Sequence, residues 1–206
     1  MGSLRRSESA GSIHRSTGSN FEPMPERAPE LFETSRLLLR RPLPGDSQAI
    51  FHRYAGDALV TQYLSWPTHR TVAETYAFVE WSDAEWKRWP AGPYLIFNRE
   101  KDCARVLGST GLVFKEDNSA EVGYALARNA WGQGFATEAL RAILVIAKRI
   151  GIVHLRAGCH AANLASAHVL EKCGFQCEGI ALERALFPNL AGGVRADVLH
   201  YSILLQ

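Results

Sequence analysis

One short stretch, Trp131-Gly-Gln-Gly-Phe-Ala-Thr-Glu-Ala139, limits the folds open to this chain more than any other part of the sequence. It lies between a predicted strand that ends near Ala127 and a strongly apolar helix predicted over residues 134–150. Gly132 and Gly134 let the backbone approach a ligand closely, and the first turn of a helix carries free N–H groups and a partial positive charge. We therefore expect a phosphate-bearing ligand at this turn.

Two common phosphate-binding motifs do not fit the stretch. A P-loop needs Gly-Lys-Ser/Thr, but Gln133 stands in place of a lysine. A dinucleotide-binding loop needs a third glycine where Thr137 stands. The ligand is therefore another phosphate-bearing cofactor, or the glycines only turn the chain from strand to helix.

The sequence before the turn predicts a strand, two helices and then three strands. The first strand covers residues 36–40, and Pro44-Gly45-Asp46 starts a helix that ends near Tyr54. Thr71-Val-Ala-Glu74 is a capping box, which predicts a long helix from there to Pro90. An antiparallel meander of three strands is predicted at residues 94–97, 104–114 and 120–126.

After the turn, helices and strands alternate. Behind the apolar helix we predict a strand, a helix and two more strands, at residues 154–159, 162–173, 175–182 and 196–204. The meander followed by strands with helical crossovers indicates an α+β fold. We expect a mixed, mostly antiparallel central sheet with helices on both faces.

Length and composition indicate one globular domain. Of 206 residues, 47% are hydrophobic and 21% are charged, which suffices for a buried core. Residues 1–30 are rich in Ser, Gly, Arg and Pro, so we predict a flexible tail there and a single domain over residues 31–206. The net charge of +2 and the lack of long apolar stretches predict a cytoplasmic protein without nucleic-acid or membrane partners.

The cysteines fit neither a disulfide framework nor a metal site. Four are present, Cys103, Cys159, Cys173 and Cys177, and their spacing matches no paired zinc framework. We predict reduced thiols and no metal.

A second motif follows about thirty residues after the glycine turn. Asn163-Leu-Ala-Ser166 leads into Val169-Leu-Glu-Lys-Cys-Gly-Phe175, where a glycine ends a helix and Phe175 begins a strand. Together the two motifs resemble those of the GNAT superfamily of N-acetyltransferases, most closely its RimJ/RimL-like ribosomal-protein N-acetyltransferase branch. That branch carries W-G-x-G-[YF]-A-T-E-A, then N-x-x-S followed by L-E-K-x-G-F, and the resemblance runs from about Ser35 to the C-terminus.

The resemblance implies the GNAT fold and direct transfer of an acetyl group from acetyl-CoA to a primary amine in a ternary complex. It implies that backbone N–H groups bind the CoA pyrophosphate, from Gly132, Gln133, Gly134, Phe135, Ala136 and Thr137. The backbone of Tyr124 and Leu126 would pair with the pantetheine arm as an added strand. Asn163 would contact the same arm, and the Leu126 N–H would stabilise the oxyanion.

Two side chains are candidates for proton transfer. Leu170 stands where many relatives carry a tyrosine acid, so Ser166 is the candidate for protonating the departing thiolate, unless it only hydrogen-bonds within its helix. Glu121 lies three residues before Tyr124, and among apolar neighbours it would be a strong proton acceptor for the amine. The alternatives are an exposed strand glutamate or a chain of waters.

The acceptor is the least defined part of the prediction. Trp66 and His69 lie in the region that covers the acceptor cleft in this family, so they are candidates for substrate binding, with ordinary packing as the alternative. The acceptor is a protein N-terminus or a small amine such as a polyamine or aminoglycoside. A catalytically inactive CoA-binding sensor is also open. We expect a monomer or homodimer.

Overall fold

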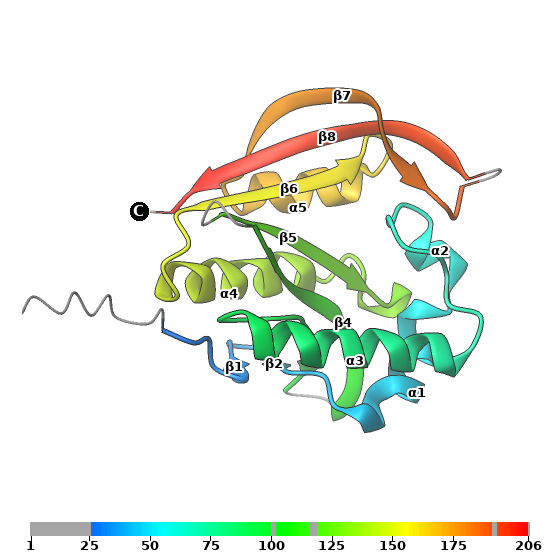
Figure 1. Ribbon diagram of the computed structural model, residues 1–206, viewed down its shortest axis with the longest axis vertical. Helices are drawn as coiled ribbons and strands as arrows, with labels where there is room; N and C mark the ends of the chain where they lie inside the picture. The colour runs from blue at the N-terminus through cyan, green and yellow to red at the C-terminus, as the bar shows by residue number, and fades with distance from the viewer. Residues whose placement is uncertain (1–25, 100–101, 116–118, 191–192, 206) are drawn as a thin grey trace, which may run out of the picture.

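The computed structural model describes residues 26–99, 102–115, 119–190 and 193–205, without the side chains of residues 102–104. This part of the chain forms an eight-stranded sheet in the order β1-β2-β3-β4-β5-β6-β8-β7 (Figure 1). The strands are β1 (Leu31–Glu33), β2 (Leu37–Arg40), β3 (Tyr94–Asn98), β4 (Asp102–Phe114), β5 (Ser119–Leu126), β6 (His154–His160), β7 (Gln176–Phe187) and β8 (Val194–Leu204). Neighbours are antiparallel except β5 and β6, which confirms the mixed, mostly antiparallel sheet.

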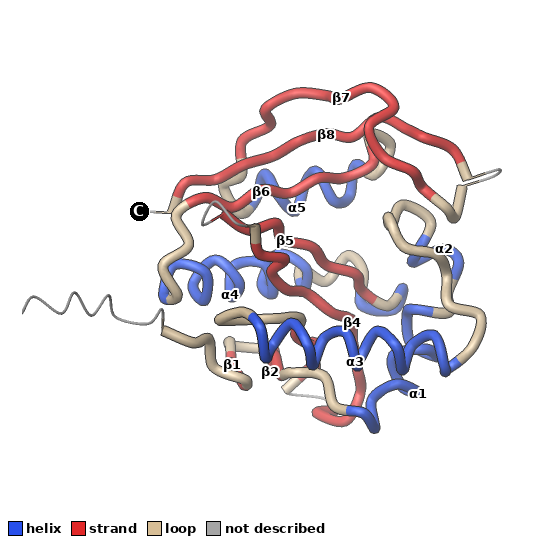
Figure 2. The backbone as a smooth tube through the Cα atoms, in the orientation of Figure 1, coloured by secondary structure: helices blue, strands red, loops and turns tan. Residues whose placement is uncertain are grey.

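The helical segments lie between β2 and β3 and between β5 and β7 (Figure 2). They are η1 (Pro44–Asp46), α1 (Ser47–Ile50), η2 (Phe51–Ala55), α2 (Ala58–Thr61), α3 (Val72–Arg88), η3 (Arg128–Ala130), α4 (Phe135–Arg149) and α5 (Leu164–Lys172). The predicted cap at Thr71 is present, because the Thr71 hydroxyl accepts from the Glu74 N–H. The Glu74 carboxylate accepts from the Arg70 N–H, one residue before the Thr71 N–H that a full capping box would use.

The predicted elements are all present, with three additions and one correction. β1, α2 and η3 were not predicted, because three or four residues are too few to show a period. Helical crossovers usually join parallel strands, so the expectation of parallel pairing after the meander is confirmed for β5 and β6 but wrong for β7 and β8. β8 lies between β6 and β7 and pairs antiparallel with both, so β7 is the outer strand of the sheet.

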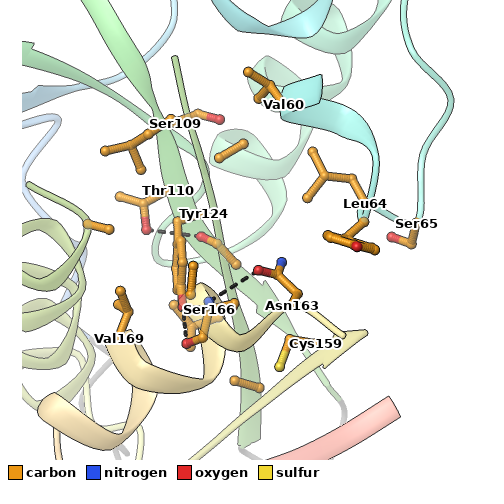
Figure 3. Close-up of a pocket in the computed structure, with 18 of the residues that line it drawn as sticks. Val60, Leu64, Ser65, Ser109, Thr110, Tyr124, Cys159, Asn163, Ser166 and Val169 are labelled. Carbon is orange, nitrogen blue, oxygen red and sulfur yellow. Dashed lines mark hydrogen bonds between the residues drawn. The ribbon is translucent and has the colours of Figure 1, made fainter. Parts of the chain in front are cut away.

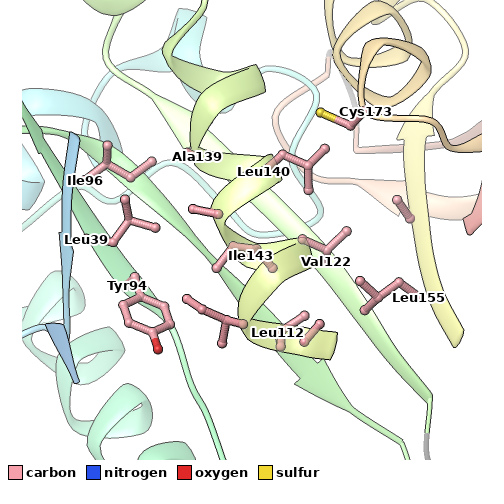
Figure 4. Packing of buried hydrophobic residues seen from close by; sticks show 14 of the residues in the cluster. Leu39, Tyr94, Ile96, Leu112, Val122, Ala139, Leu140, Ile143, Leu155 and Cys173 are labelled. Atoms are coloured by element: carbon pink, nitrogen blue, oxygen red, sulfur yellow. The ribbon is translucent and has the colours of Figure 1, made fainter. Parts of the chain in front are cut away.

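The core has two parts, one on each face of the sheet. On one face, α4 buries a stripe that includes Ala139, Leu140 and Ile143 against strand residues such as Leu39 and Val122 (Figure 4). The spacing of three and four residues along α4 produces this stripe. On the other face, a second cluster joins α1, η2 and α3 to β3 and β4, with Ile50, Tyr54, Val79, Leu95, Phe97 and Val106 buried.

Part of the predicted tail is packed against the domain. The Ala28 N–H donates to the Pro90 carbonyl, and the Tyr94 hydroxyl donates to the Pro29 carbonyl. Ala28 is buried. Residues 1–25 lie outside the described residues, so a flexible tail there stays a prediction.

Candidate functional site

The site begins where two neighbouring strands separate. β5 and β6 are paired over three positions: Ser119 with His154, Ala120 with Leu155 and Glu121 with Arg156. Beyond these pairs the strands diverge, and residues of both line a pocket with a volume of about 1500 Å³. Small-molecule pockets usually measure roughly 300–1,000 Å³, so there is room for two substrates side by side.

The glycine turn lies at one end of this pocket. Gly132 and Gly134 have φ values of 71° and 77°, in the left-handed region that side chains disfavour. Gly134 is the N-cap of α4 and provides no side-chain cap. In the described part of the chain, no group accepts a hydrogen bond from the backbone N–H groups of Gly132 to Thr137. A helix start of this kind fits a diphosphate.

Arg36 and Glu138 support the turn from behind. Arg36 Nη1 donates to the Gln133 carbonyl at 3.0 Å, and Arg36 Nε donates to Glu138 Oε2 at 2.7 Å. Glu138 also accepts from the Thr34 and Ser35 hydroxyls and from the Arg36 N–H. Burial raises the pKa of Glu138, but these hydrogen bonds outweigh it and the pKa lies below its ordinary value. The carboxylate is therefore fully engaged and does not compete with an anion at the helix start.

Trp131 has a role that the sequence did not show. Its indole Nε1 donates to the Leu126 carbonyl at 2.7 Å, which fastens the start of the turn to the end of β5. The Ala127 N–H donates to the Leu107 carbonyl on β4. Because backbone groups alternate along a strand, the Leu126 N–H points to the opposite edge, toward the gap. A ligand can therefore accept a hydrogen bond from the Leu126 N–H, as predicted, whereas the Leu126 carbonyl already accepts one from the Trp131 indole.

Tyr124, Ser166 and Asn163 meet on the α5 side of the gap (Figure 3). The Tyr124 hydroxyl lies 2.9 Å from Ser166 Oγ and 3.0 Å from the Ser166 carbonyl oxygen. Burial raises the pKa of Tyr124, so its hydroxyl stays protonated at neutral pH. Asn163 Oδ1 accepts from the Ser166 N–H at 3.2 Å and caps α5. The sequence placed Tyr124 here only through its backbone.

Cys159 lies near this group and also lines the pocket (Figure 3). Burial raises the pKa of this thiol, and the Ser166 hydroxyl offsets part of the effect. Cys159 is therefore a thiol at neutral pH. Cys159, Cys173 and Cys177 are free, as predicted, whereas the Cys103 side chain lies outside the described residues.

Glu121 lines the pocket but not in the setting that we expected. Its side chain is 54% exposed, and the Lys115 Nζ atom lies 3.4 Å from Glu121 Oε2. Val113 stands opposite Glu121 on β4, but apolar side chains do not enclose the carboxylate, because it lies on the open face of β5, close to where β5 begins. Its role as a base stays a prediction.

Trp66 and His69 contact each other and also line the pocket. Their ring centroids are 5.2 Å apart, and His69 Nδ1 lies 2.8 Å from the buried Thr75 Oγ1. Burial lowers the pKa of His69, although Glu74 opposes the shift. His69 is therefore a neutral ring at pH 7.

Two kinds of feature are missing from the described part of the chain. No three His, Cys, Asp or Glu side chains in it are grouped as metal ligands would be. No helix in the same ranges is long and apolar enough to cross a membrane.

A bare helix start opening on a gap between diverging strands fits a ligand that has a diphosphate and an extended arm. The chain belongs to the GNAT family of acetyltransferases: the model described as an acetyltransferase (GNAT) domain matches residues 36–176. The protein is thus an acetyl-CoA-dependent N-acetyltransferase.

Similar proteins agree with this assignment. The chain is 28% identical over 178 residues to p20 of Bacillus licheniformis, described as an uncharacterized N-acetyltransferase, covering 85% of this chain and 96% of p20. It is 27% identical over 177 residues to Bacillus subtilis YoaA, described likewise, covering 84% and 96%.

Solved structures share the fold. A RimL ribosomal L7/L12 α-N-protein acetyltransferase in complex with coenzyme A superimposes with a TM-score of 0.75 at 23% identity, covering 85% of this chain and 98% of that one. The Salmonella typhimurium acetyltransferase that modifies the N-terminal serine of L7/L12 gives 0.73 at 23% identity, covering 84% and 97%.

Proposed function

We propose that this enzyme acetylates the α-amino group at the N-terminus of a peptide or protein. The observation that carries the proposal is the charge of the pocket wall. Glu74 and Glu121 are the carboxylates among the described lining residues, and the Arg70 N–H and Lys115 already engage them. Lys172 and Arg184 line the same pocket, as does Arg156.

Such a wall disfavours a polycation. A polyamine or aminoglycoside carries several positive charges and needs free carboxylates to balance them. A peptide N-terminus brings one amine and need carry no further positive charge. The RimL enzymes of similar fold, named for acetylating L7/L12, are in keeping with this acceptor.

Three groups of residues would bind acetyl-CoA, which supplies the thioester when bound. The N–H groups from Gly132 to Thr137 would hold its diphosphate. The Leu126 N–H and the Tyr124 backbone would hold the pantetheine arm and polarise the thioester carbonyl. Because Asn163 uses its Oδ1 to cap α5, its Nδ2 hydrogens are left for the same arm.

Two side chains that line the pocket would carry out the proton transfers. We assign Ser166 as the hydrogen-bond donor to the leaving sulfur, with Tyr124 orienting its hydroxyl. Glu121 would take the proton of the acceptor amine, directly or through water. Trp66 and His69 would frame the first residue of the acceptor.

The test is acetyl transfer from labelled acetyl-CoA to Ser- and Ala-initiated peptides, spermidine and an aminoglycoside. We expect the best peptide to exceed both small amines in kcat/KM. Glu121→Gln and Ser166→Ala should each lower kcat at least about tenfold, by the usual weight of acid–base groups, and calorimetry should show unchanged CoA affinity.

Faster transfer to spermidine than to any peptide would overturn the acceptor assignment. CoA binding without turnover on the whole panel would indicate a sensor. An unchanged rate in either variant would remove that residue from the mechanism.

A further inference from the structure

Two walls of the pocket come from segments far apart in the sequence. One is the loop after α2, from which Gln62, Tyr63, Leu64, Ser65 and Trp66 line the pocket. The other is the end of β7, which contributes Ala185 and Phe187. Figure 1 shows α2 close to the end of β7. Neither segment belongs to the donor-binding turn.

Asn189, just after β7, joins these walls. Its Nδ2 group donates to the Thr61 carbonyl at 2.7 Å and to the Trp66 carbonyl at 2.8 Å. Its Oδ1 atom accepts from the Thr68 N–H at 2.7 Å and from the Thr68 hydroxyl at 3.0 Å. Both amide hydrogens and both acceptor positions of one side chain are therefore used, across 121 to 128 residues of sequence.

Aromatic contacts reinforce the junction without defining its geometry. Tyr63 stacks on His160 with ring centroids 4.7 Å apart, and His160 meets Phe187 edge-on at 4.7 Å. Stacked rings slide at little cost, whereas hydrogen bonds have fixed lengths and directions. The four bonds of Asn189 therefore set the position of loop 61–69 relative to the hairpin.

We infer that Asn189 is a positioning residue that fixes the acceptor wall of the pocket and so determines which acceptors fit. Asn189 is not itself among the lining residues, and it acts through Trp66 and its neighbours. The inference rests on the proposed function only in calling this wall the acceptor side. The physical coupling of the two segments can be measured without any turnover.

The first experiment is hydrogen exchange on Asn189→Ala, read by mass spectrometry. The Leu64 and His69 N–H groups report on the loop, because they donate to the Thr61 and Ala55 carbonyls. We expect exchange in residues 61–69 and 186–190 to rise together by about tenfold or more, since several hydrogen bonds of about 1 kcal/mol each are lost. Exchange at the start of α4 and CoA affinity should not change. Unchanged exchange in loop 61–69 would overturn the inference.

A matched pair at Thr68 separates the hydrogen bond from general destabilisation. Thr68→Ser keeps the hydroxyl that contacts Asn189, whereas Thr68→Val removes it at nearly constant volume. The same hydroxyl contacts the Thr61 hydroxyl within the loop, so the informative readout is exchange in residues 186–190, on the Asn189 side of the junction. We expect wild-type exchange there in Thr68→Ser and faster exchange in Thr68→Val. Equal behaviour of the two would overturn the inference even if Asn189→Ala fails to fold.

Steady-state kinetics is then measured with the best acceptor from the peptide and amine panel. Asn189→Ala should raise the acceptor KM several-fold, with the KM for acetyl-CoA unchanged and kcat largely kept. Equal losses for both substrates would show a merely structural role and overturn the assignment to the acceptor side. If the panel shows no turnover, the proposed function fails, while the exchange result still decides whether Asn189 couples the walls.

Discussion

The direction of the hydrogen bond between Tyr124 and Ser166 determines whether the Ser166 hydroxyl hydrogen is free for another acceptor. The Tyr124 hydroxyl can donate to Ser166 Oγ or to the Ser166 carbonyl, which lie at 2.9 and 3.0 Å. If it donates to Oγ, the serine keeps its own hydrogen free for another acceptor. If it donates to the carbonyl, the serine hydrogen turns toward the tyrosine. A protonated Tyr124 is needed for the first arrangement, and burial ensures it.

We therefore predict graded effects at this pair. Ser166→Ala should lower kcat at least about tenfold, whereas Tyr124→Phe should lower it by a smaller factor, because the serine remains but loses its orienting partner. Steady-state kinetics at saturating acetyl-CoA measures both. A larger loss in Tyr124→Phe than in Ser166→Ala would make the tyrosine the donor instead.

At the scale of single elements, β5 combines a crowded face and an open one. Tyr124 is directed to α5, while Gly123 lies on the opposite face and lines the pocket. A Cβ atom built on Gly123 would meet no heavy atom within 4 Å, and its φ is not in the left-handed region. The strand thus leaves open space where an acceptor would lie.

Gly123→Ala should fold normally but obstruct the acceptor. We predict a melting temperature close to that of the wild type and a several-fold higher acceptor KM. Gly45→Ala is the matched control, because its Cβ would also meet nothing and it lies outside the pocket. Acceptor kinetics that are identical in the two variants would show that the open face of β5 does not touch the acceptor.

The start of α4 depends on a residue of another element. Arg36 holds the Gln133 carbonyl, and this fixes the peptide plane whose N–H belongs to Gly134. Arg36→Gln should therefore weaken CoA binding several-fold while kcat at saturation is kept. Arg36→Lys should not rescue it, because lysine lacks the planar fork that bridges Gln133 and Glu138. Calorimetry with CoA checks both variants, and full affinity in Arg36→Lys would contradict the prediction.

At the scale of the whole molecule, Glu138 connects the N-terminal strands to α4 across more than 100 residues. Its native-state pKa lies below the ordinary value of 4.5, so between the two values the native state binds fewer protons than the unfolded chain. The stability that it contributes is complete above about pH 4.5 and is lost as the pH falls through the native-state pKa.

Glu138→Gln should accordingly lower the free energy of unfolding by about 1–3 kcal/mol at pH 7, with the difference shrinking toward pH 3. Denaturant unfolding at both pH values measures this. Glu33→Gln is the control, because the Glu33–Arg99 pair is exposed and such pairs contribute little. A difference that is constant with pH would show that the charge of Glu138 is not the cause.

The sequence predicted those features that depend on local pattern. Glycines at a strand-to-helix turn, a capping box at Thr71 and the apolar period of α4 each act within a few residues, so the elements and the helix start were predictable. Contacts between distant segments were not. The Tyr124–Ser166 contact and the Asn189 junction depend on how strands are ordered, and no local period encodes that order. The indole bond of Trp131 spans only five residues, but the direction of a side chain in an irregular turn follows no period either. The setting of Glu121 was misjudged because its exposure depends on which face of β5 is covered, and the pattern of β5 does not show that.

The three-position pairing of β5 and β6 has a thermal consequence. The strands β6 to β8 join the rest of the sheet through that short seam, with further contacts from α5 and from the Asn189 junction to loop 61–69. An acetyl-CoA molecule whose amide groups hydrogen-bond to the diverging strand edges would bridge β5 and β6 beyond their three paired positions. We expect the free energy of unfolding, and with it the melting temperature, to rise with acetyl-CoA concentration. The rise in free energy is about 2.7 kcal/mol at one hundred times the dissociation constant.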